Sequence, residues 1–226
     1  MGSNPIPSAI LAPLSEVGHP VILIGQYDSP FVRRVGIALT LYEMPFEHRP
    51  WSAFKDAERL RALNPLCRVP TLVLDDGTVL ADSHAMLDHL DGLVPAGRAM
   101  FPRAEPERHK ALRIATLATG LGDKAVSLFY EFRMHREVSQ MWADRCRSQI
   151  LAALATLEAE CPNGGYWFAD RIGHADIAVA AVLRFVDEAH PGLFDPCGHP
   201  ALAAHAARLE ALPVFRQVAQ TFKPPS

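Results

Sequence analysis

The sequence predicts an α+β protein in which a small domain of strands and helices precedes an all-helical domain. Two observations indicate this class. Short apolar and β-branched runs alternate with helical patterns in the first part of the chain, in the order βαβαββα. Beyond a stretch rich in Gly and Pro, strand signals nearly vanish and Ala- and Leu-rich helical patterns continue to the end.

The first strand is predicted in VILIGQY at 21–27, because the turn residues Asp-Ser-Pro follow this short apolar run at once. Apolar residues then recur at helical spacing until Pro45, which predicts a helix with Ser29 as its cap and Pro30 in its first turn. The stretch QYDSPFVRRV is therefore interpreted as a strand-to-helix corner.

Two further strand-and-helix units follow. FEHRPW at 46–51 is typical of an edge strand because it contains a proline, and a short helix is expected at 52–63 with Phe54 facing inward. TLVLDDGTVLAD at 71–82 predicts a hairpin around Asp-Gly. A helix from Ser83 to about Asp91 completes this part of the chain.

The second half contains five predicted helices, at about 105–135, 137–161, 174–189, 200–211 and 213–221. Gly120 and Gly122 interrupt the first of them, which indicates a bend or a close helix approach. We expect domain boundaries that give a flexible leader at 1–20, a first domain at 21–94, a linker at 95–105 and a helical domain at 106–226.

Composition argues against several function classes. With 49% hydrophobic residues and a formal net charge of −3, the chain lacks the basic excess of a nucleic-acid-binding protein. It also lacks an apolar run of about 18 residues, so no membrane span is expected. The four cysteines form no CxxC pair and the first twenty residues contain no Lys or Arg, which favours a cytoplasmic protein over a secreted one.

Metal and nucleotide chemistry have little support in the sequence. His84 and His89 are five residues apart, off the spacing that places two ligands on one helix face, and there is no HExxH. Neither GxGxxG nor a P-loop is present. We therefore predict no metal site.

Three local features are candidates for a binding site, each with a structural alternative. Ser29 offers a hydroxyl at a helix N-terminus, where an anion is favoured, or it is simply a cap. Val69 precedes Pro70 directly before a strand, where a cis bond would turn its backbone outward, although most such bonds are trans. Asp82 and Ser83 lie between the hairpin and a helix, where one of them could instead serve only as the cap.

Taken in order, these three features and the all-helical second half resemble the cytosolic glutathione transferases over nearly the whole chain from Val21 onward. The resemblance implies a thioredoxin-like first domain, a helical second domain, a homodimer and glutathione as co-substrate. It is most similar to the bacterial type in which a serine activates the thiol, an activity associated with detoxification.

The resemblance also implies roles for individual residues. Ser29 matches the activating serine, Val69 the backbone that pairs with the cysteinyl part of glutathione, and Asp82 with Ser83 the acidic-Ser pair. The acidic residue of this pair is more often Glu, so Asp82 has a shorter reach. Arg68 stands where the family pattern has a basic residue and is expected to meet the glycine carboxylate.

The expected chemistry is the activation of a thiol whose ordinary pKa is near 8.5. The Ser29 hydroxyl, the helix dipole and the positive charge of Arg33 or Arg34 would each favour the thiolate, which would attack an electrophilic carbon. Tyr27 is the rival activator, since other members of the family use a tyrosine near the end of the first strand. Its alternative is an aromatic residue packed in the core.

The second substrate is expected to be a hydrophobic electrophile on the side of the helical domain. The candidate pocket residues are Tyr27, Phe129, Tyr130, Met134 and Trp142. Phe, Tyr and Met at helical spacing are also typical of an ordinary core, so this alternative stays open.

Two other functions compete with a transferase. A glutathione-dependent disulfide reductase or peroxidase is compatible with the fold, although the corner has Ser-Pro-Phe-Val and no cysteine of its own. A non-catalytic glutathione-transferase-like binding protein is the other alternative. Binding of glutathione without turnover of an electrophile or a disulfide would identify it.

Overall fold

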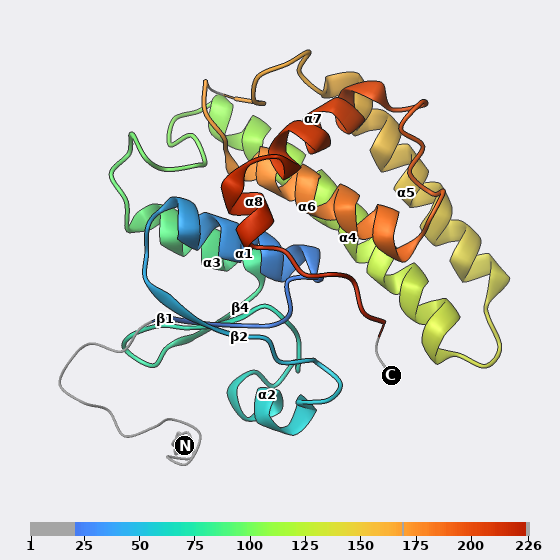
Figure 1. The fold of residues 1–226 in the computed structure, drawn as a ribbon, viewed down its shortest axis with the longest axis horizontal. Coiled ribbons are helices and arrows are strands. Elements are labelled where there is room, and N and C mark those ends of the chain that lie inside the picture. The colour runs from blue at the N-terminus through green and yellow to red at the C-terminus, as the bar shows by residue number, and fades with distance from the viewer. Residues whose placement is uncertain (1–20, 169, 225–226) are drawn as a thin grey trace.

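The computed structural model describes residues 21–168 and 170–224, so the leader expected at 1–20 lies outside the described residues. The predicted α+β class and the order βαβαββα followed by helices are confirmed. Figure 1 shows the sheet with α1, α2 and α3 close to it, and the remaining helices gathered on one side.

The sheet has four strands in the order β2-β1-β3-β4. They are β1 (Val21–Ile24), β2 (Phe46–Arg49), β3 (Thr71–Val73) and β4 (Val79–Ala81). Strands β1 and β2 are parallel, whereas β3 pairs antiparallel with both β1 and β4. The predicted edge strand and the Asp-Gly hairpin are thus confirmed, and β1 ends three residues earlier than predicted because the backbone turns at Gly25, whose φ is +133°.

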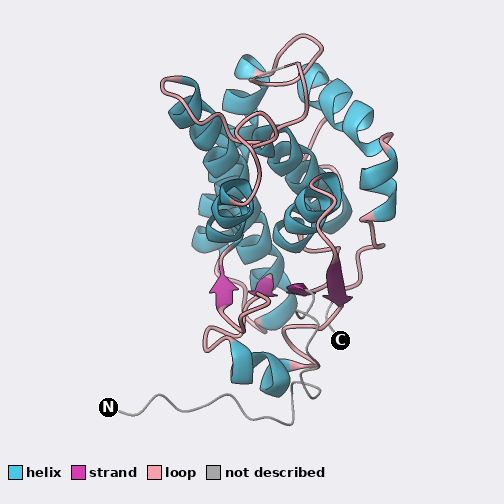
Figure 2. Cartoon of the chain, turned by 90° about the vertical axis from the view of Figure 1, so that its left-hand side faces the viewer, coloured by secondary structure: helices cyan, strands magenta, loops and turns pink. Residues whose placement is uncertain are grey.

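Helices cover both faces of this sheet (Figure 2). Helices α1 (Pro30–Leu41) and α3 (Ser83–Gly92) lie on one face, and α2 (Ala57–Leu63) lies on the other. Because side chains alternate along a strand, Leu23 packs toward α1 and α3, while its neighbours Ile22 and Ile24 pack toward α2. The alternating side chains of β1 therefore contribute to two small cores, one on each face of the sheet.

The predicted helix at 52–63 is shorter than expected. It begins at Ala57, because Ser52 Oγ accepts hydrogen bonds from the N–H groups of Phe54 and Lys55 and holds the chain in a turn. Phe54 consequently does not face inward. Its side chain is 44% exposed and packs edge-on against Tyr130 of the helical part, with ring centroids 5.5 Å apart.

The helical part consists of α4 (Glu107–Met134), α5 (Gln140–Glu160), α6 (His174–Ala189), α7 (Pro200–Glu210) and α8 (Pro213–Gln217). The predicted close approach occurs at Gly122, where a Cβ atom would lie 3.1 Å from Val182 Cγ2 of α6. A Cβ at Gly120 would meet open space. Among the described helices, none combines the length and the apolar character needed to cross a membrane.

Asp91 at the end of α3 joins the two parts of the chain. Its carboxylate accepts hydrogen bonds from the Tyr42 hydroxyl, from His174 Nε2 at 2.8 Å and from the N–H of Phe101 at 2.8 Å. Burial opposes ionisation of Asp91, but these hydrogen bonds prevail and lower its pKa. The start of α6 and the segment before α4 are thereby held against α1 and α3.

Arg33 on α1 makes a second link, to the C-terminal end of the chain. Its buried guanidinium donates to both carboxylate oxygens of Glu210, at 2.5 and 2.8 Å, and to the carbonyls of Phe215 and Val218, each at 2.8 Å. Every nitrogen of the side chain therefore has an acceptor. This arrangement satisfies the condition under which a buried charge is tolerated.

Replacing Arg33 by Met tests this link. We expect the Arg33→Met variant to lose about 3 kcal/mol of unfolding free energy, because two buried carbonyls lose their donor and Glu210 keeps only its ion pair with Arg184. Urea denaturation measures the loss. The control Glu47→Gln, which removes the charge of an exposed ion pair with Arg49, is expected to change stability little. Equal stability of Arg33→Met and the wild type would contradict the assignment.

Candidate active site

Ser29 lies directly before α1, at the mouth of a cavity of about 630 Å³. Its Oγ accepts a long hydrogen bond of 3.4 Å from the N–H of Val32, which makes it the N-cap. Among the described residues, no acceptor takes the hydrogen of this hydroxyl. Ser29 is thus both the predicted cap and a donor available to a ligand at the positive end of a helix.

The corner before Ser29 depends on Gly25. Besides its positive φ, a Cβ at this position would lie 2.5 Å from Val32 Cγ2 and 2.8 Å from Val69 Cβ. Only glycine fits there without displacing the first turn of α1 or the loop before β3. The absent side chain is what allows Val69 to lie close to the start of α1.

Val69 presents its backbone at the cavity. The Val69–Pro70 peptide bond is cis, and neither the N–H nor the carbonyl of Val69 has a hydrogen-bond partner within 21–168 and 170–224. Arg68, next to it, extends into solvent and approaches Asp123 of α4 at 3.7 Å. Both residues line the large cavity and a smaller one beside it.

The smaller cavity, of about 200 Å³, contains the predicted acidic-Ser pair. Asp82 is the N-cap of α3, since its Oδ1 accepts from the N–H of His84 at 2.7 Å. Ser83 is 4% exposed, and its Oγ accepts a hydrogen bond of 3.3 Å from Arg34 Nη1. The fold therefore brings Ser29, Arg68, Val69, Asp82 and Ser83 to two adjoining cavities.

The residues predicted for the electrophile pocket divide into two groups. Phe129 and Tyr130 line the large cavity, whereas Tyr27, Met134 and Trp142 are not among its lining residues. Met134 ends α4 with 45% of its side chain exposed, and Trp142 on α5 donates its indole N–H to Ser127. The prediction that Met134 and Trp142 line this wall is therefore wrong, because the turns of α4 and α5 carry these two residues away from the cavity.

Tyr27 lies on the far side of the corner. Its ring stacks on His48 with a centroid separation of 3.9 Å and closes against Gly36, where a Cβ would be 2.8 Å from Tyr27 Cε1. Burial raises the pKa of its hydroxyl to about 12. Its position is that of the packed aromatic residue named above as the alternative.

Besides the predicted Phe129 and Tyr130, the cavity is lined by three aromatic residues that the sequence did not single out as its walls, Phe54, Phe185 and Phe222. Phe54, Tyr130, Phe129, Phe222 and Phe185 form an unbroken series of edge-to-face contacts with centroid separations of 5.3 to 5.8 Å. All five line the cavity. They come from four separate segments, so no local periodicity could have indicated their grouping.

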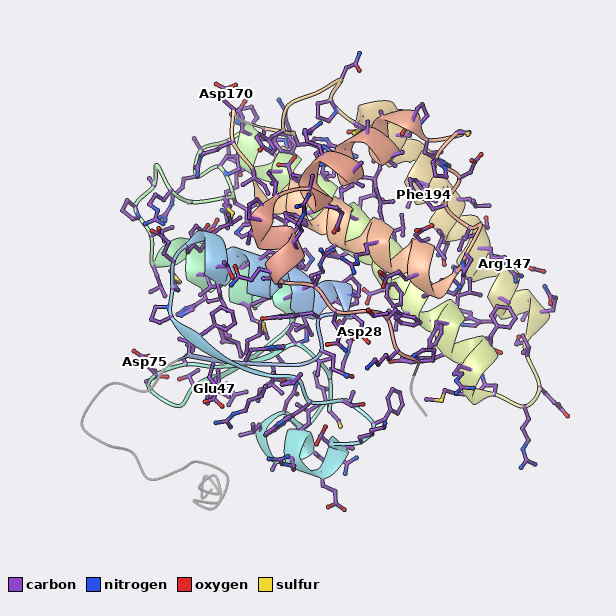
Figure 3. The ribbon with its side chains drawn as sticks, viewed as in Figure 1. Asp28, Glu47, Asp75, Arg147, Asp170 and Phe194 are labelled. Carbon is purple, nitrogen blue, oxygen red and sulfur yellow. The ribbon has the colours of Figure 1, made fainter. Side chains whose placement is uncertain are left out.

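Two acidic residues, Asp28 and Asp123, and two basic residues, Arg68 and Lys223, line the large cavity. Burial raises the pKa of both Asp28 and Asp123, and the N–H of Lys223 donates to Asp28 Oδ2 at 3.3 Å. Figure 3 shows Asp28 at the start of α1, beside the C-terminal segment. Cys67 also lines the cavity, with its Sγ near the carbonyls of Ala53 and Ala57.

The expectation that Arg33 or Arg34 supplies positive charge at Ser29 is wrong. Arg33 and Arg34 do not lie at Ser29, because a helix turns by about 100° per residue and carries both side chains to other faces of α1. Within the described part of the chain, no group of three His, Cys, Asp or Glu residues is arranged to hold a metal ion.

Comparison with known proteins places this geometry in context. Residues 28–93 match the model of the glutathione S-transferase N-terminal domain, and residues 140–208 match that of the C-terminal domain. An uncharacterized GST-like protein of Escherichia coli (strain K12), YibF, is 30% identical over 73% of this chain and 81% of its own length. A maleylacetoacetate isomerase of Pseudomonas aeruginosa is 28% identical over 86% and 93%, respectively.

Solved structures agree over most of the chain. A glutathione S-transferase from Methylobacterium radiotolerans, in complex with glutathione sulfonate, has a TM-score of 0.83 and 29% identity, covering 92% of this chain and 100% of its own. A glutathione transferase family member from Pseudomonas fluorescens Pf-5, with bound glutathione, has a TM-score of 0.77 and 32% identity, covering 91% and 100%. From these matches and the shared fold, the chain belongs to the glutathione S-transferase family.

Proposed function

We propose that this chain binds glutathione and activates its thiol for attack on a hydrophobic electrophile, with Ser29 as the catalytic residue. The observation that carries the proposal is the Ser29 hydroxyl, which has no acceptor among the described residues and lies at a helix N-terminus on the cavity. Similar proteins crystallised with glutathione or its sulfonate support the choice of co-substrate.

The two adjoining cavities match the shape of a short extended peptide. The unpaired backbone of Val69 can pair with the cysteinyl unit as a strand would. Arg68, whose ion pair with Asp123 is exposed, can meet the glycine carboxylate, and Asp82 and Ser83 can meet the γ-glutamyl group. When glutathione binds in this orientation, its cysteinyl sulfur lies near Ser29.

The chemistry requires only that the thiolate be favoured. A Ser29 O–H donated to sulfur and the positive end of α1 both stabilise the anion, and each unit of pKa lowered corresponds to about 1.4 kcal/mol. The thiol proton leaves to solvent. The sulfur lone pair then forms an S–C bond to the electrophilic carbon, and the leaving group takes the displaced electron pair.

The second substrate would occupy the large cavity against the series of five aromatic rings. This wall of aromatic rings favours an apolar group. We therefore propose an apolar electrophile. Turnover of a disulfide or a peroxide by bound glutathione would instead identify the reductase alternative, and binding without any turnover would identify a binding protein.

We propose further that the active form is a homodimer. An apolar groove lined by Leu117, Leu121 and Ala153 runs between α4 and α5, and Met141 on α5 is 84% exposed. Apolar surface of this kind is typical of an interface. Native mass spectrometry should give twice the chain mass, and a single-chain mass at micromolar concentration would contradict the dimer.

The role of Ser29 is tested through the pKa of the bound thiol. We expect Ser29→Ala to raise that pKa by about one unit or more, because the sulfur loses a hydrogen bond, and to leave glutathione affinity at low pH nearly unchanged. Ultraviolet absorbance of the thiolate against pH measures it. Tyr27→Phe is the matched control, and a shift in this variant with none in Ser29→Ala would transfer the role to the tyrosine.

The apolar cavity is tested with S-benzyl-glutathione. We expect Phe222→Ala to weaken its binding by about 1 kcal/mol, because two edge-to-face contacts are lost at the cavity, while glutathione itself binds as before. Calorimetric titration of both ligands makes the comparison. Phe132→Ala, on the exposed surface of α4, should bind both normally. An equal loss for the two ligands in Phe222→Ala would argue against the proposed pocket.

A further inference from the structure

Arg34 is a fully buried arginine whose hydrogen bonds are incomplete. It lies on α1 next to Arg33, and its exposed fraction is 0%. Nη1 donates to Ser83 Oγ at 3.3 Å and lies 3.5 Å from His84 Nε2, while Nε and Nη2 have no partner. Arg33, one residue earlier, has a hydrogen-bond acceptor for every nitrogen of its side chain.

The charge of Arg34 has no counterion within reach. No carboxylate of the described residues lies within 4 Å of it, although the field of Asp82 favours its charged form. Burial lowers the pKa of Arg34 to about 10, so it remains a cation at neutral pH. A buried cation without a partner is costly in a structure, and its presence calls for an anion that arrives later.

Arg34 is connected to the smaller cavity through Ser83 and His84. His84 Nε2 lies 2.8 Å from Thr119 Oγ1, and Thr119 donates its own hydrogen to the carbonyl of Ala115. Burial, with the charge of Arg34, lowers the pKa of His84 to about 4, so His84 is neutral. Asp82 Oδ1 is occupied by the N–H of His84. Ser83 and His84 both line the smaller cavity, and Arg34 contacts both of them from the buried side.

The contact with Ser83 has a direct consequence for the hydroxyl. Because Ser83 Oγ accepts from a cationic donor on its buried side, its own hydrogen is left to point toward the cavity. Hydrogen bonds in series polarise one another, so the hydroxyl becomes a stronger donor. An anionic acceptor placed in the cavity would gain from this donor and from the charge behind it.

We propose that Arg34 is a positioning residue that orients the Ser83 hydroxyl and supplies the positive charge for the α-carboxylate of the γ-glutamyl group. The inference rests on the proposed function, since it assigns one end of the same peptide. Arg34 does not touch the ligand. It acts through Ser83, and it would discriminate between ligands that have this carboxylate and ligands that lack it.

The test compares two ligands by calorimetric titration. One is glutathione, and the other is the tripeptide in which 4-aminobutyrate replaces the γ-glutamyl unit, so that only the α-carboxylate is removed. We expect Arg34→Met to bind glutathione about tenfold more weakly than the wild type does, and to bind the analogue as the wild type does. Arg34→Lys keeps the charge and is expected to retain most of the discrimination.

Two controls separate positioning from a structural role. In a Ser83→Ala background, Arg34→Met should weaken glutathione binding less than it does in the wild type, because Arg34 can no longer act on the ligand through the Ser83 hydroxyl. Arg33→Lys changes a paired arginine on the same helix and should lower stability without altering the discrimination. The ligand-free Arg34→Met variant should be as stable as the wild type, since removing an unpaired buried charge relieves a cost.

The results of these titrations lead to different conclusions about Arg34. If Arg34→Met weakens both ligands equally, or lowers stability and leaves the ratio of the two affinities unchanged, the inference is overturned and Arg34 is structural. If the wild type binds glutathione and the variant binds it equally well, only the inference fails. If the wild type binds no glutathione, the proposed function fails and the inference fails with it.

Discussion

The packing of α1 between the sheet and α6 is the constraint on which the rest of the structure depends. Nine of its twelve residues are buried, so the helix can neither rotate nor slide without opening the core that it shares with β1, α3 and α6. Its N-terminus therefore stands at a fixed place, at the end of β1. Gly25 and Gly36, which leave no room for a side chain, bring the corner and Tyr27 into contact with the same helix. The packing of α1 therefore sets the position of Ser29.

Two adjacent arginines on α1 are buried in opposite ways. Arg33 is surrounded by Glu210 and by carbonyls of the C-terminal segment, which makes it part of the scaffold. Arg34 faces Ser83 and has two unpaired nitrogens. Completed networks stabilise a fold, whereas incomplete ones are found where a ligand or a reaction completes them. In our proposal, this contrast reflects a structural role for Arg33 and a ligand-positioning role for Arg34.

The site is assembled from segments that are far apart in the sequence. The β1–α1 corner, the loop before β3 and the start of α3 line the two cavities on one side, while α4, α6 and the C-terminal segment close the larger cavity on the other. Asp28 connects these sides, since it precedes Ser29 and accepts from the N–H of Lys223. Such an arrangement couples the shape of the cavity to the docking of the last residues of the chain. The contacts that hold the fold together therefore also set the shape of the cavity.

The sequence by itself determined the class, the order of strands and helices, and the places where Ser29, Val69 and Ser83 occur, because caps, turns and periodicity are local properties of a few neighbouring residues. Only the tertiary structure decided what those residues face. Phe222 joins the aromatic wall because the segment after α8 packs against Phe129 and Phe185. That Met134 lies outside the wall and that Arg34 lies behind Ser83 follow from the rotation of helices against one another. That rotation is set by interdigitating side chains across the whole interior, which no short stretch of sequence contains.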